Sequence, residues 1–397
     1  MGKNLIVLLA LAAFAGGSAL NLFAQAAKEE AKPAAKNALD AFTPEVEAFL
    51  YYSLEATSGA DKANAFDNSR TYIGGKYALS DNLTFRYVSD IGHETGGGKF
   101  EVFAKYAYLD WKLNNSTHLI FGLQGSRNWS VDEKEWGYRG IRKTPMESFG
   151  DYYGGANKTY TAALDSRIST EPALAAQLTE QKAVFAWSTR DKMGSSADQA
   201  ITLSLKPNAG TYLDFMVLNG SGYKKAEDDK YKNIQVRAGR YLSDKAVHLS
   251  GYFEIEPWSF TSAGARKSYT NAQWDLLAAF TARGKGQFAV NYNGKRFAGS
   301  YEDITAGCFS VFGSFNLGRK NVKGLARLDY YKTGFNTSAG MAPGEANLKT
   351  NATLFILGVD FMPNSHVHII PDVQVLSSED SAVKTSNILY LHVLVSF

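Results

Sequence analysis

The end of the chain decides the fold: residues 387–397 read NILYLHVLVSF. Counting back from Phe397, every second residue is apolar, namely Val395, Val393, Leu391 and Leu389. A period of two predicts a β-strand with one apolar face. Chain termini are usually loosely held unless a sheet or a helix ties them down. We therefore expect the last strand to be a paired part of a sheet, up to its final residue.

The same alternation recurs in segments of about ten residues along most of the chain. Residues 45–56 (EVEAFLYYSLEA), 83–91 (LTFRYVSDI) and 247–256 each place apolar side chains on one face and polar ones on the other. Counting such segments gives about sixteen strands between residues 44 and 397. The composition agrees, because 36 Gly, 24 Phe, 22 Tyr and 6 Trp against 9 Pro suit many strands and turns.

The connections between these segments alternate in length. Short turns such as 80–82 and 363–364 are separated by longer polar connections, for example 221–230 and 257–269. An even number of alternating ten-residue strands with this arrangement is typical of a transmembrane barrel. In hydrocarbon every backbone group must be paired, so the sheet must close. The predicted fold class is all-β: a transmembrane antiparallel β-barrel of about 16 strands, closed by the strand ending at Phe397. A secreted β-sandwich or propeller is the alternative.

The beginning of the chain has the pattern of an export signal. Lys3 precedes the apolar run of residues 5–14, and Ala24-Gln25-Ala26 has the small-x-small form of a cleavage site. The run is too short for about 20 residues of membrane-spanning helix. We expect a signal peptide over residues 1–26, a polar periplasmic leader over 27–43, and the barrel over 44–397.

Composition and motifs argue against several functional classes. The 42 basic and 39 acidic residues nearly balance, so no nucleic-acid partner is indicated, and the single cysteine, Cys308, excludes an internal disulfide framework. The glycine-rich stretch 92–100 (GHETGGGKF) lacks the spacing of a phosphate-binding loop. His366 and His368 alone are too few for a metal site. No Gly-x-Ser-x-Gly motif occurs, so we expect no catalytic residue, metal or cofactor.

The longest connection, residues 127–196, follows the fifth predicted strand. Its first part, 129–154, reads WSVDEKEWGYRGIRKTPMESFGDYYG. In its second part, the spacing of apolar residues predicts a short helix over 171–184 with Thr170 as N-cap. This helix would narrow the lumen or cap the extracellular mouth; the alternative is a surface ornament.

Residues 129–154, with DFMVLNGSGY (214–223) and VHIIPDV (367–373), resemble the bacterial outer-membrane porin family that includes the phosphate-selective porins O and P. The alternating apolar residues of the last strand (the terminal ladder), together with Phe397, resemble the carboxyl-terminal signal that the barrel assembly machinery recognises. The resemblance implies a trimeric, water-filled channel in the bacterial outer membrane, surrounded by lipid and lipopolysaccharide. It also implies that the loop after strand 5 folds toward the lumen and that basic residues at the constriction favour anions.

These considerations give a set of candidate site residues. We expect the pore constriction to contain Arg139, Arg142, Lys143 and Glu135, because fixed charges in a narrow lumen focus the field on passing ions. The alternative is that the three basic residues pair with the loop's own acidic residues and only anchor it. Inward-facing positions predict a lumen lined by Arg86, Asp90, Lys105, Arg237, Glu254, Arg327 and Asp329. This mixture of signs favours general diffusion over strict phosphate selectivity.

The sequence therefore predicts a porin of the outer membrane, without enzymatic activity, through which small hydrophilic solutes or ions diffuse passively with a weak anion preference. Two alternatives from other classes remain. One is a secreted, non-membrane β-protein that binds carbohydrate. The other is an outer-membrane barrel enzyme, for which the paired carboxylates Glu254 and Glu256 would suit glycoside hydrolysis.

Overall fold

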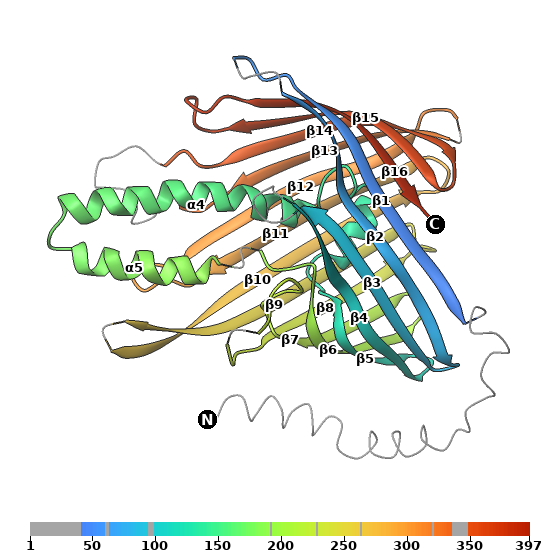
Figure 1. The fold of residues 1–397 in the computed structure, drawn as a ribbon, viewed down its shortest axis with the longest axis horizontal. Coiled ribbons are helices and arrows are strands. Elements are labelled where there is room, and N and C mark those ends of the chain that lie inside the picture. Colours follow the sequence, from blue (N-terminus) through green and yellow to red (C-terminus); the bar gives the residue numbers. More distant parts are fainter. Residues whose placement is uncertain are drawn as a thin grey trace.

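The chain forms a closed barrel of sixteen antiparallel strands in the computed structural model (Figure 1). The structure describes residues 41–59, 63–93, 99–190, 193–227, 229–262, 264–319, 321–335 and 348–397. The predicted signal peptide and nearly all of the predicted leader lie outside these residues. The first strand begins at Phe42, two residues before the predicted start of the barrel.

The strands follow one another around the barrel in sequence order. They are β1 (Phe42–Glu55), β2 (Asn64–Ser80), β3 (Leu83–His93), β4 (Phe100–Asn114), β5 (Thr117–Gly125), β6 (Ala197–Asn208), β7 (Thr211–Leu218), β8 (Asn233–Leu242), β9 (Val247–Ser262), β10 (Ala265–Ala282), β11 (Gly286–Phe297), β12 (Ile304–Asn316), β13 (Val322–Lys332), β14 (Ala352–Asn364), β15 (Val367–Ser378) and β16 (Ser386–Ser396).

Pairing of β1 with β16 closes the barrel. The register runs from Glu47 opposite Ser396 to Glu55 opposite Ile388. Beyond the last strand residue, Phe397 and Val46 exchange two backbone hydrogen bonds of 2.8 and 3.0 Å. This confirms the expectation drawn from the terminal ladder: the final residue is held because its strand completes the sheet.

Short turns occupy one end of the barrel, and the longer connections occupy the other. In outer-membrane barrels the short turns lie on the periplasmic side, and we name the two ends accordingly. One predicted long loop is wrong. Residues 257–269 belong mostly to β9 and β10, which extend each other's ladder up to Ser262 and Ala265. Because their side chains are polar, the sequence indicated a loop, although the segment forms a hairpin of two strands that projects beyond the barrel wall.

The connection after β5 contains three helices: α3 (Ser130–Trp136), α4 (Pro145–Thr170) and α5 (Ala175–Ser188). The predicted helix over 171–184 corresponds to α5 shifted toward the carboxyl end. The predicted N-cap is wrong, since Thr170 ends α4 and Leu174 precedes α5. None of the helices in the described part of the chain is both long and apolar enough to cross a membrane.

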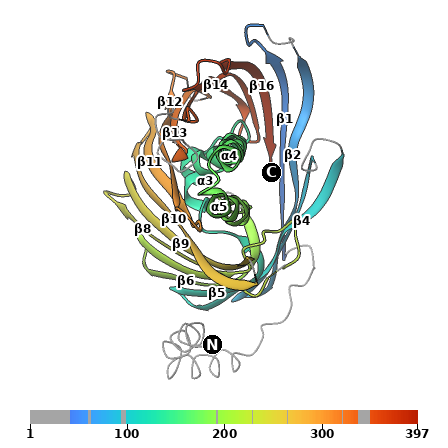
Figure 2. The same ribbon diagram turned by 90° about the vertical axis from the view of Figure 1, so that its left-hand side faces the viewer.

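The helices lie on one side of the barrel interior. Viewed into the extracellular end, α3, α4 and α5 are framed by the ring of strands, next to β9–β13 (Figure 2), and the side view shows α5 and the adjoining part of α4 extending out of that end (Figure 1). The largest apolar core of the molecule is found there, between these helices and the inward faces of β10–β15. The outside of the barrel is also apolar, but its side chains are exposed rather than buried: Phe121, Phe253 and Leu276, for example, are 50–60% exposed. Such a surface suits lipid.

Candidate pore constriction

Arg237, on β8, anchors the start of the long connection to the barrel wall. Its guanidinium is fully buried. It donates to the backbone carbonyls of Arg127 and Asn128 at 2.7 and 2.9 Å. It also donates to the carboxylates of Asp132, on α3, and Asp275, on β10, at 3.2 and 2.8 Å. Burial and the neighbouring charge of Asp275 raise the pKa of Asp132 well above its usual range.

Side chains of β13, β14 and β15 form a second anchor, which fixes the segment between α3 and α4. Arg327, on β13, donates to the carbonyl of Lys143 and forms an ion pair with Asp329 at 2.6 Å. The hydroxyl of Tyr138 donates to Asp360, on β14, at 3.2 Å. The amide of Gln374, on β15, donates to the carbonyl of Ile141 at 3.1 Å. The loop after strand 5 therefore lies within the barrel, held by side chains of the wall.

Gly140 marks the point where this segment meets β1 and β16. A Cβ atom at this position would lie 2.6 Å from a methyl group of Leu394 and 2.9 Å from the ring of Phe49. Both distances are too short for non-bonded carbon atoms, so a larger residue would push the segment away from the wall. The backbone thus crosses the barrel interior from β8–β11 to β14–β16 and β1.

A capping box starts α4 directly after this crossing. The Thr144 side chain accepts from the backbone N–H of Glu147, and the Glu147 carboxylate accepts from the backbone N–H of Thr144, at 3.4 and 3.3 Å. Pro145 occupies the first turn, where its missing N–H costs no hydrogen bond. Burial raises the pKa of Glu147, but the Arg139 guanidinium 2.9 Å away, together with Lys143 and Lys105, outweighs burial and lowers that pKa below the ordinary value.

Stacked aromatic rings hold α4 against the wall. Tyr153 stacks on Phe297 with ring centroids 4.8 Å apart, and Tyr160 stacks on Phe335 at the same distance. All four side chains are fully buried. Each such pair adds about 0.5–1.5 kcal/mol beyond the burial of its area. The half of the interior next to β10–β15 is therefore a dry core.

Accessible polar side chains line the other half of the interior, along β1–β4. Inward side chains there retain contact with solvent: Glu45 is 24%, Arg86 25% and Lys76 49% exposed. The three form a cluster in which Glu45 accepts from both Lys76 and Arg86 at 2.7 Å. By contrast, Arg237 and Arg327 on the opposite wall are fully buried. Water can therefore reach the interior between the long connection and β1–β4.

Two basic side chains meet at one oxygen where the long connection faces this wall. Arg139 donates to the hydroxyl of Tyr72, on β2, at 3.1 Å, and Lys105, on β4, donates to the same hydroxyl at 2.9 Å. Arg139 is neutralised by Glu147 and, at 3.6 Å, by Glu133. No carboxylate pairs with Lys105 among the described residues. Its ammonium lies instead over the ring of Tyr72, 4.3 Å from the centroid.

The polar network continues toward the extracellular end. Arg70 forms an ion pair with Asp90, and the hydroxyl of Tyr223 donates to the same carboxylate at 2.7 Å. Lys224 lies over the ring of Phe103, 4.2 Å from the centroid. Burial and the nearby Arg70 lower the pKa of Lys224, whereas burial raises the pKa of Tyr223 to about 12. Basic and aromatic side chains thus alternate along this wall.

The four candidate constriction residues have different surroundings. Arg139 reaches across to Tyr72, as described above. Arg142 is half-buried, and its guanidinium has no partner among the described residues. Lys143 forms an exposed ion pair with Asp151 at 2.7 Å. Glu135 accepts from His248 and Gln287 at 2.7 and 2.6 Å and so joins the anchored side of α3.

The candidate lumen residues all face inward but divide into two groups. Arg86, Asp90 and Lys105 belong to β3 and β4, on the polar side. Arg237, Arg327 and Asp329 are buried beneath the long connection, and Glu254 is buried between Tyr252 and Asn233. These four residues do not border an open lumen, because the loop packs over them. Asp90 and Lys105 are also buried, beside Arg70 and Tyr72, so Arg86 alone of the seven candidates is partly exposed. Arg70 and Tyr72 are site residues that the sequence argument missed, although their place in the alternation of β2 marks both as inward.

No protein-family model and no curated protein matches the chain. Solved structures do. OprB of Pseudomonas putida matches over 90% of this chain and 95% of its own, with 10% identity and a TM-score of 0.60. The anion-selective porin of Comamonas acidovorans matches over 90% and 99%, with 11% identity and a TM-score of 0.59. OmpT of Vibrio cholerae, in a trimer form, matches over 90% and 100%, with 15% identity and a TM-score of 0.53. The chain has the fold of bacterial outer-membrane β-barrels.

Proposed function

We propose that this protein is a porin of the bacterial outer membrane through which small hydrophilic solutes and ions diffuse passively. The route runs between the long connection and the wall of β1–β4. Support comes from the closed barrel with its apolar exterior, from the porins among its structural neighbours, and from the solvent-exposed charges on this one wall. Neither a reaction nor a cofactor is part of the proposal.

We further propose that the route favours anions weakly. One observation carries this step: Lys105 and Arg139 converge on the Tyr72 hydroxyl, and of the two only Arg139 has a carboxylate within ion-pair distance among the described residues. Two cations held together beside a confined passage raise the local concentration of anions, although the carboxylates of Glu47, Asp90 and Glu147 offset part of the Lys105 charge. The preference is weak because Glu45 and Asp90 lie on the same wall. Strict selectivity for phosphate, as in the family named above, is not part of the proposal.

The test is a planar-bilayer measurement under a potassium chloride gradient. The wild-type protein should form open channels whose reversal potential has the sign of anion preference. Lys105→Gln should shift the reversal potential toward cations, and Lys105→Arg should retain the wild-type value. Lys182→Gln is the matched control, because it removes the same charge from an exposed ion pair between Lys182, on α5, and Asp165, on α4.

The outcomes separate the two parts of the proposal. If the protein inserts but conducts no current, the porin function is wrong. If it conducts and Lys105→Gln behaves as Lys182→Gln does, the porin function stands and the anion site is wrong. Recovery of the protein in the soluble fraction would favour the secreted carbohydrate-binding alternative, and hydrolysis of lipid or glycan substrates would favour the barrel enzyme.

Two partners complete the proposal. The chain would assemble as a homotrimer, as the OmpT structure is described in a trimer form. The barrel assembly machinery would recognise the strand that ends at Phe397. Cross-linking in native membranes tests the first, and assembly of a chain lacking Phe397 tests the second.

A further inference from the structure

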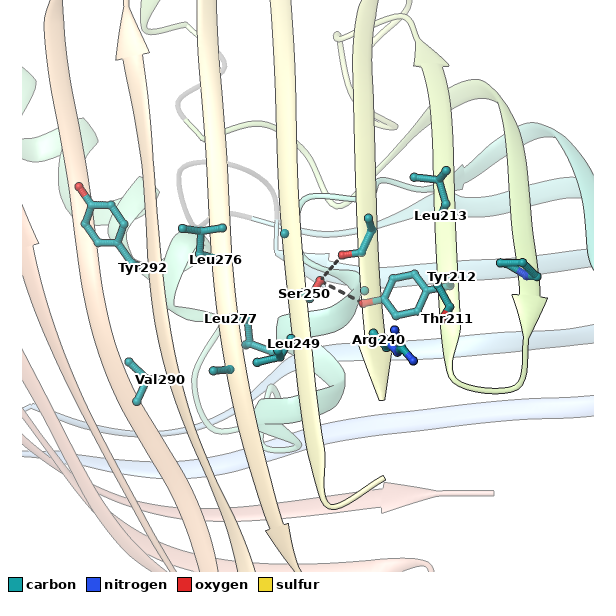
Figure 3. Close-up of a pocket in the computed structure, with 15 residues that line it drawn as sticks. Thr211, Tyr212, Leu213, Arg240, Leu249, Ser250, Leu276, Leu277, Val290 and Tyr292 are labelled. Atoms are coloured by element: carbon teal, nitrogen blue, oxygen red, sulfur yellow. Dashed lines mark hydrogen bonds between the residues drawn. The ribbon is translucent and has the colours of Figure 1, made fainter. Parts of the chain in front are cut away.

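The outer wall of the barrel contains a hollow of about 800 Å³ over β7–β11 (Figure 3). Five of its residues form one row across neighbouring strands: Leu213, Ala238, Gly251, Leu276 and Tyr292. Leu276 and Tyr292 project outward and are 60% and 47% exposed. Ala238 and Gly251 add almost no side-chain volume between the larger residues. The row therefore dips in its middle, which gives the hollow its floor.

A second row lies one step closer to the periplasmic end. In this row Arg240 pairs with Leu249, which in turn pairs with Ala278. Ala278 extends the low floor, and the surface of the hollow is almost entirely carbon. The hollow is therefore apolar, with one basic residue at its rim.

Larger side chains close the hollow at both ends. Phe253 and Trp274 are paired on the extracellular side, and Phe280 and Phe288 are paired on the periplasmic side. The three phenylalanines are 45–50% exposed, so they stand out from the wall. The hollow is thus a bounded depression in the lipid-facing surface rather than a groove that continues around the barrel.

The depth of the hollow in the membrane follows from the end of β8. Arg240 lies two residues before Leu242, where the strand ends in a short periplasmic turn. At about 3.3 Å per residue, the row containing Arg240 is roughly 7 Å along the strand from that end. The apolar band of such barrels is about 25 Å tall. The hollow therefore lies in the periplasmic half of the membrane.

The charge of Arg240 indicates what occupies the hollow. The residue faces outward and is exposed, and no acidic side chain pairs with it among the described residues. In the periplasmic half of the described strands, no Asp or Glu occupies an outward position. The wall of a second copy of this chain could not neutralise Arg240 at this depth. The phosphate of a lipid could, because an arginine stem extends along apolar surface and places its guanidinium at the interface.

We propose that the hollow binds one glycerophospholipid of the periplasmic leaflet. An acyl chain lies over Ala238, Gly251 and Ala278, and the phosphate accepts hydrogen bonds from Arg240. The site differs from the surrounding lipid shell because it combines a bounded depression with a single cation. It is independent of the passage through the barrel.

Native mass spectrometry of the full-length protein in detergent, titrated with palmitoyl-oleoyl phosphatidylglycerol, tests this proposal. The wild type should retain one lipid per chain. Ala278→Leu fills the floor and should weaken retention about tenfold. Arg240→Gln should weaken it about fivefold. Two matched controls should leave retention unchanged: Ala104→Leu, at an exposed outward position of β4, and Arg319→Gln, in a periplasmic turn.

Three results would overturn the proposal. If all four variants retain lipid equally, the protein carries only a general lipid shell. If Ala278→Leu dissociates an oligomer without changing lipid retention, the hollow is an interface between copies. If lipid A competes with phosphatidylglycerol for the single retained position, the site belongs to the other leaflet.

Discussion

Replacement of Arg237 by Met should detach the start of the long connection from the barrel wall. The substitution removes every hydrogen bond that the guanidinium makes to the backbone of this connection. It also leaves the carboxylates of Asp132 and Asp275, both almost inaccessible to solvent, without their shared cation. Removal of one partner from a buried ion pair typically costs about 3–5 kcal/mol, and we expect a loss of stability of this size.

The assay is urea unfolding of the protein in lipid vesicles, followed by tryptophan fluorescence, together with single-channel recording. Arg237→Met should lower the free energy of unfolding and increase the conductance or its noise as the loop loosens. Arg296→Met is the matched control. Its ion pair with Asp303 is 45% and 43% exposed, and such pairs contribute about 0–1 kcal/mol.

The pH dependence of this variant provides a second check. The pKa of Asp132 is already raised in the folded wild type, and loss of Arg237 should raise it further. A group with a raised folded pKa stabilises the fold below its unfolded pKa, and that contribution is lost as pH rises through the folded pKa. The loss in free energy of unfolding caused by Arg237→Met should therefore be smaller at pH 5 than at pH 7. Equal unfolding midpoints for Arg237→Met and Arg296→Met, with unchanged conductance, would refute the anchoring role.

Four further predictions concern the barrel seam and the packing of α4. Deletion of Phe397 removes two backbone hydrogen bonds at the barrel seam and should reduce the yield of heat-modifiable, folded barrel on gels. Tyr153→Phe should leave stability unchanged or raise it by about 1 kcal/mol, because its buried hydroxyl has no hydrogen-bond partner among the described residues; Tyr153→Ala should cost about 3–5 kcal/mol in the same urea assay. Arg139 lowers the pKa of Glu147. The stabilising contribution of this ion pair should therefore persist as pH falls to about 4.5 and be lost below that pH as Glu147 is protonated. Glu147→Gln should lack this acid-dependent step in an unfolding series from pH 7 to 3. Thr144→Ala should destabilise α4 by about 1 kcal/mol, measured as a lower urea midpoint.

Local alternation determined the barrel. A strand's period of two fixes which side chains share a face, and this property can be read without knowing any contact. The inward positions of Arg86, Asp90 and Lys105 on β3 and β4 follow from it. The number of strands, their closure through the terminal strand and the position of the long connection after the fifth strand follow as well.

Helix α4 was not predicted, for reasons that are also local. Its sequence contains Gly150, Gly154 and Gly155 and several Ser and Thr residues, all poor helix formers. Its aromatic residues contact the barrel wall and α5, so they form no simple one-sided stripe. Packing inside the barrel, together with the capping box at Thr144, stabilises a helix that intrinsic preference would not favour.

Only the tertiary structure decided which inward charges contact water. The alternation predicts inward positions for both Arg237 and Arg86, yet the long connection buries Arg237, whereas the Arg86 side chain stays 25% exposed. That difference depends on contacts between residues far apart in the chain, such as Arg237 with Asp132 and Arg139 with Tyr72. Alternation along a strand specifies the face of each side chain, but it carries no information about what packs against that face. The alternating pattern of the sequence therefore determined the barrel, whereas the asymmetric interior depended on how the long connection packs against the wall.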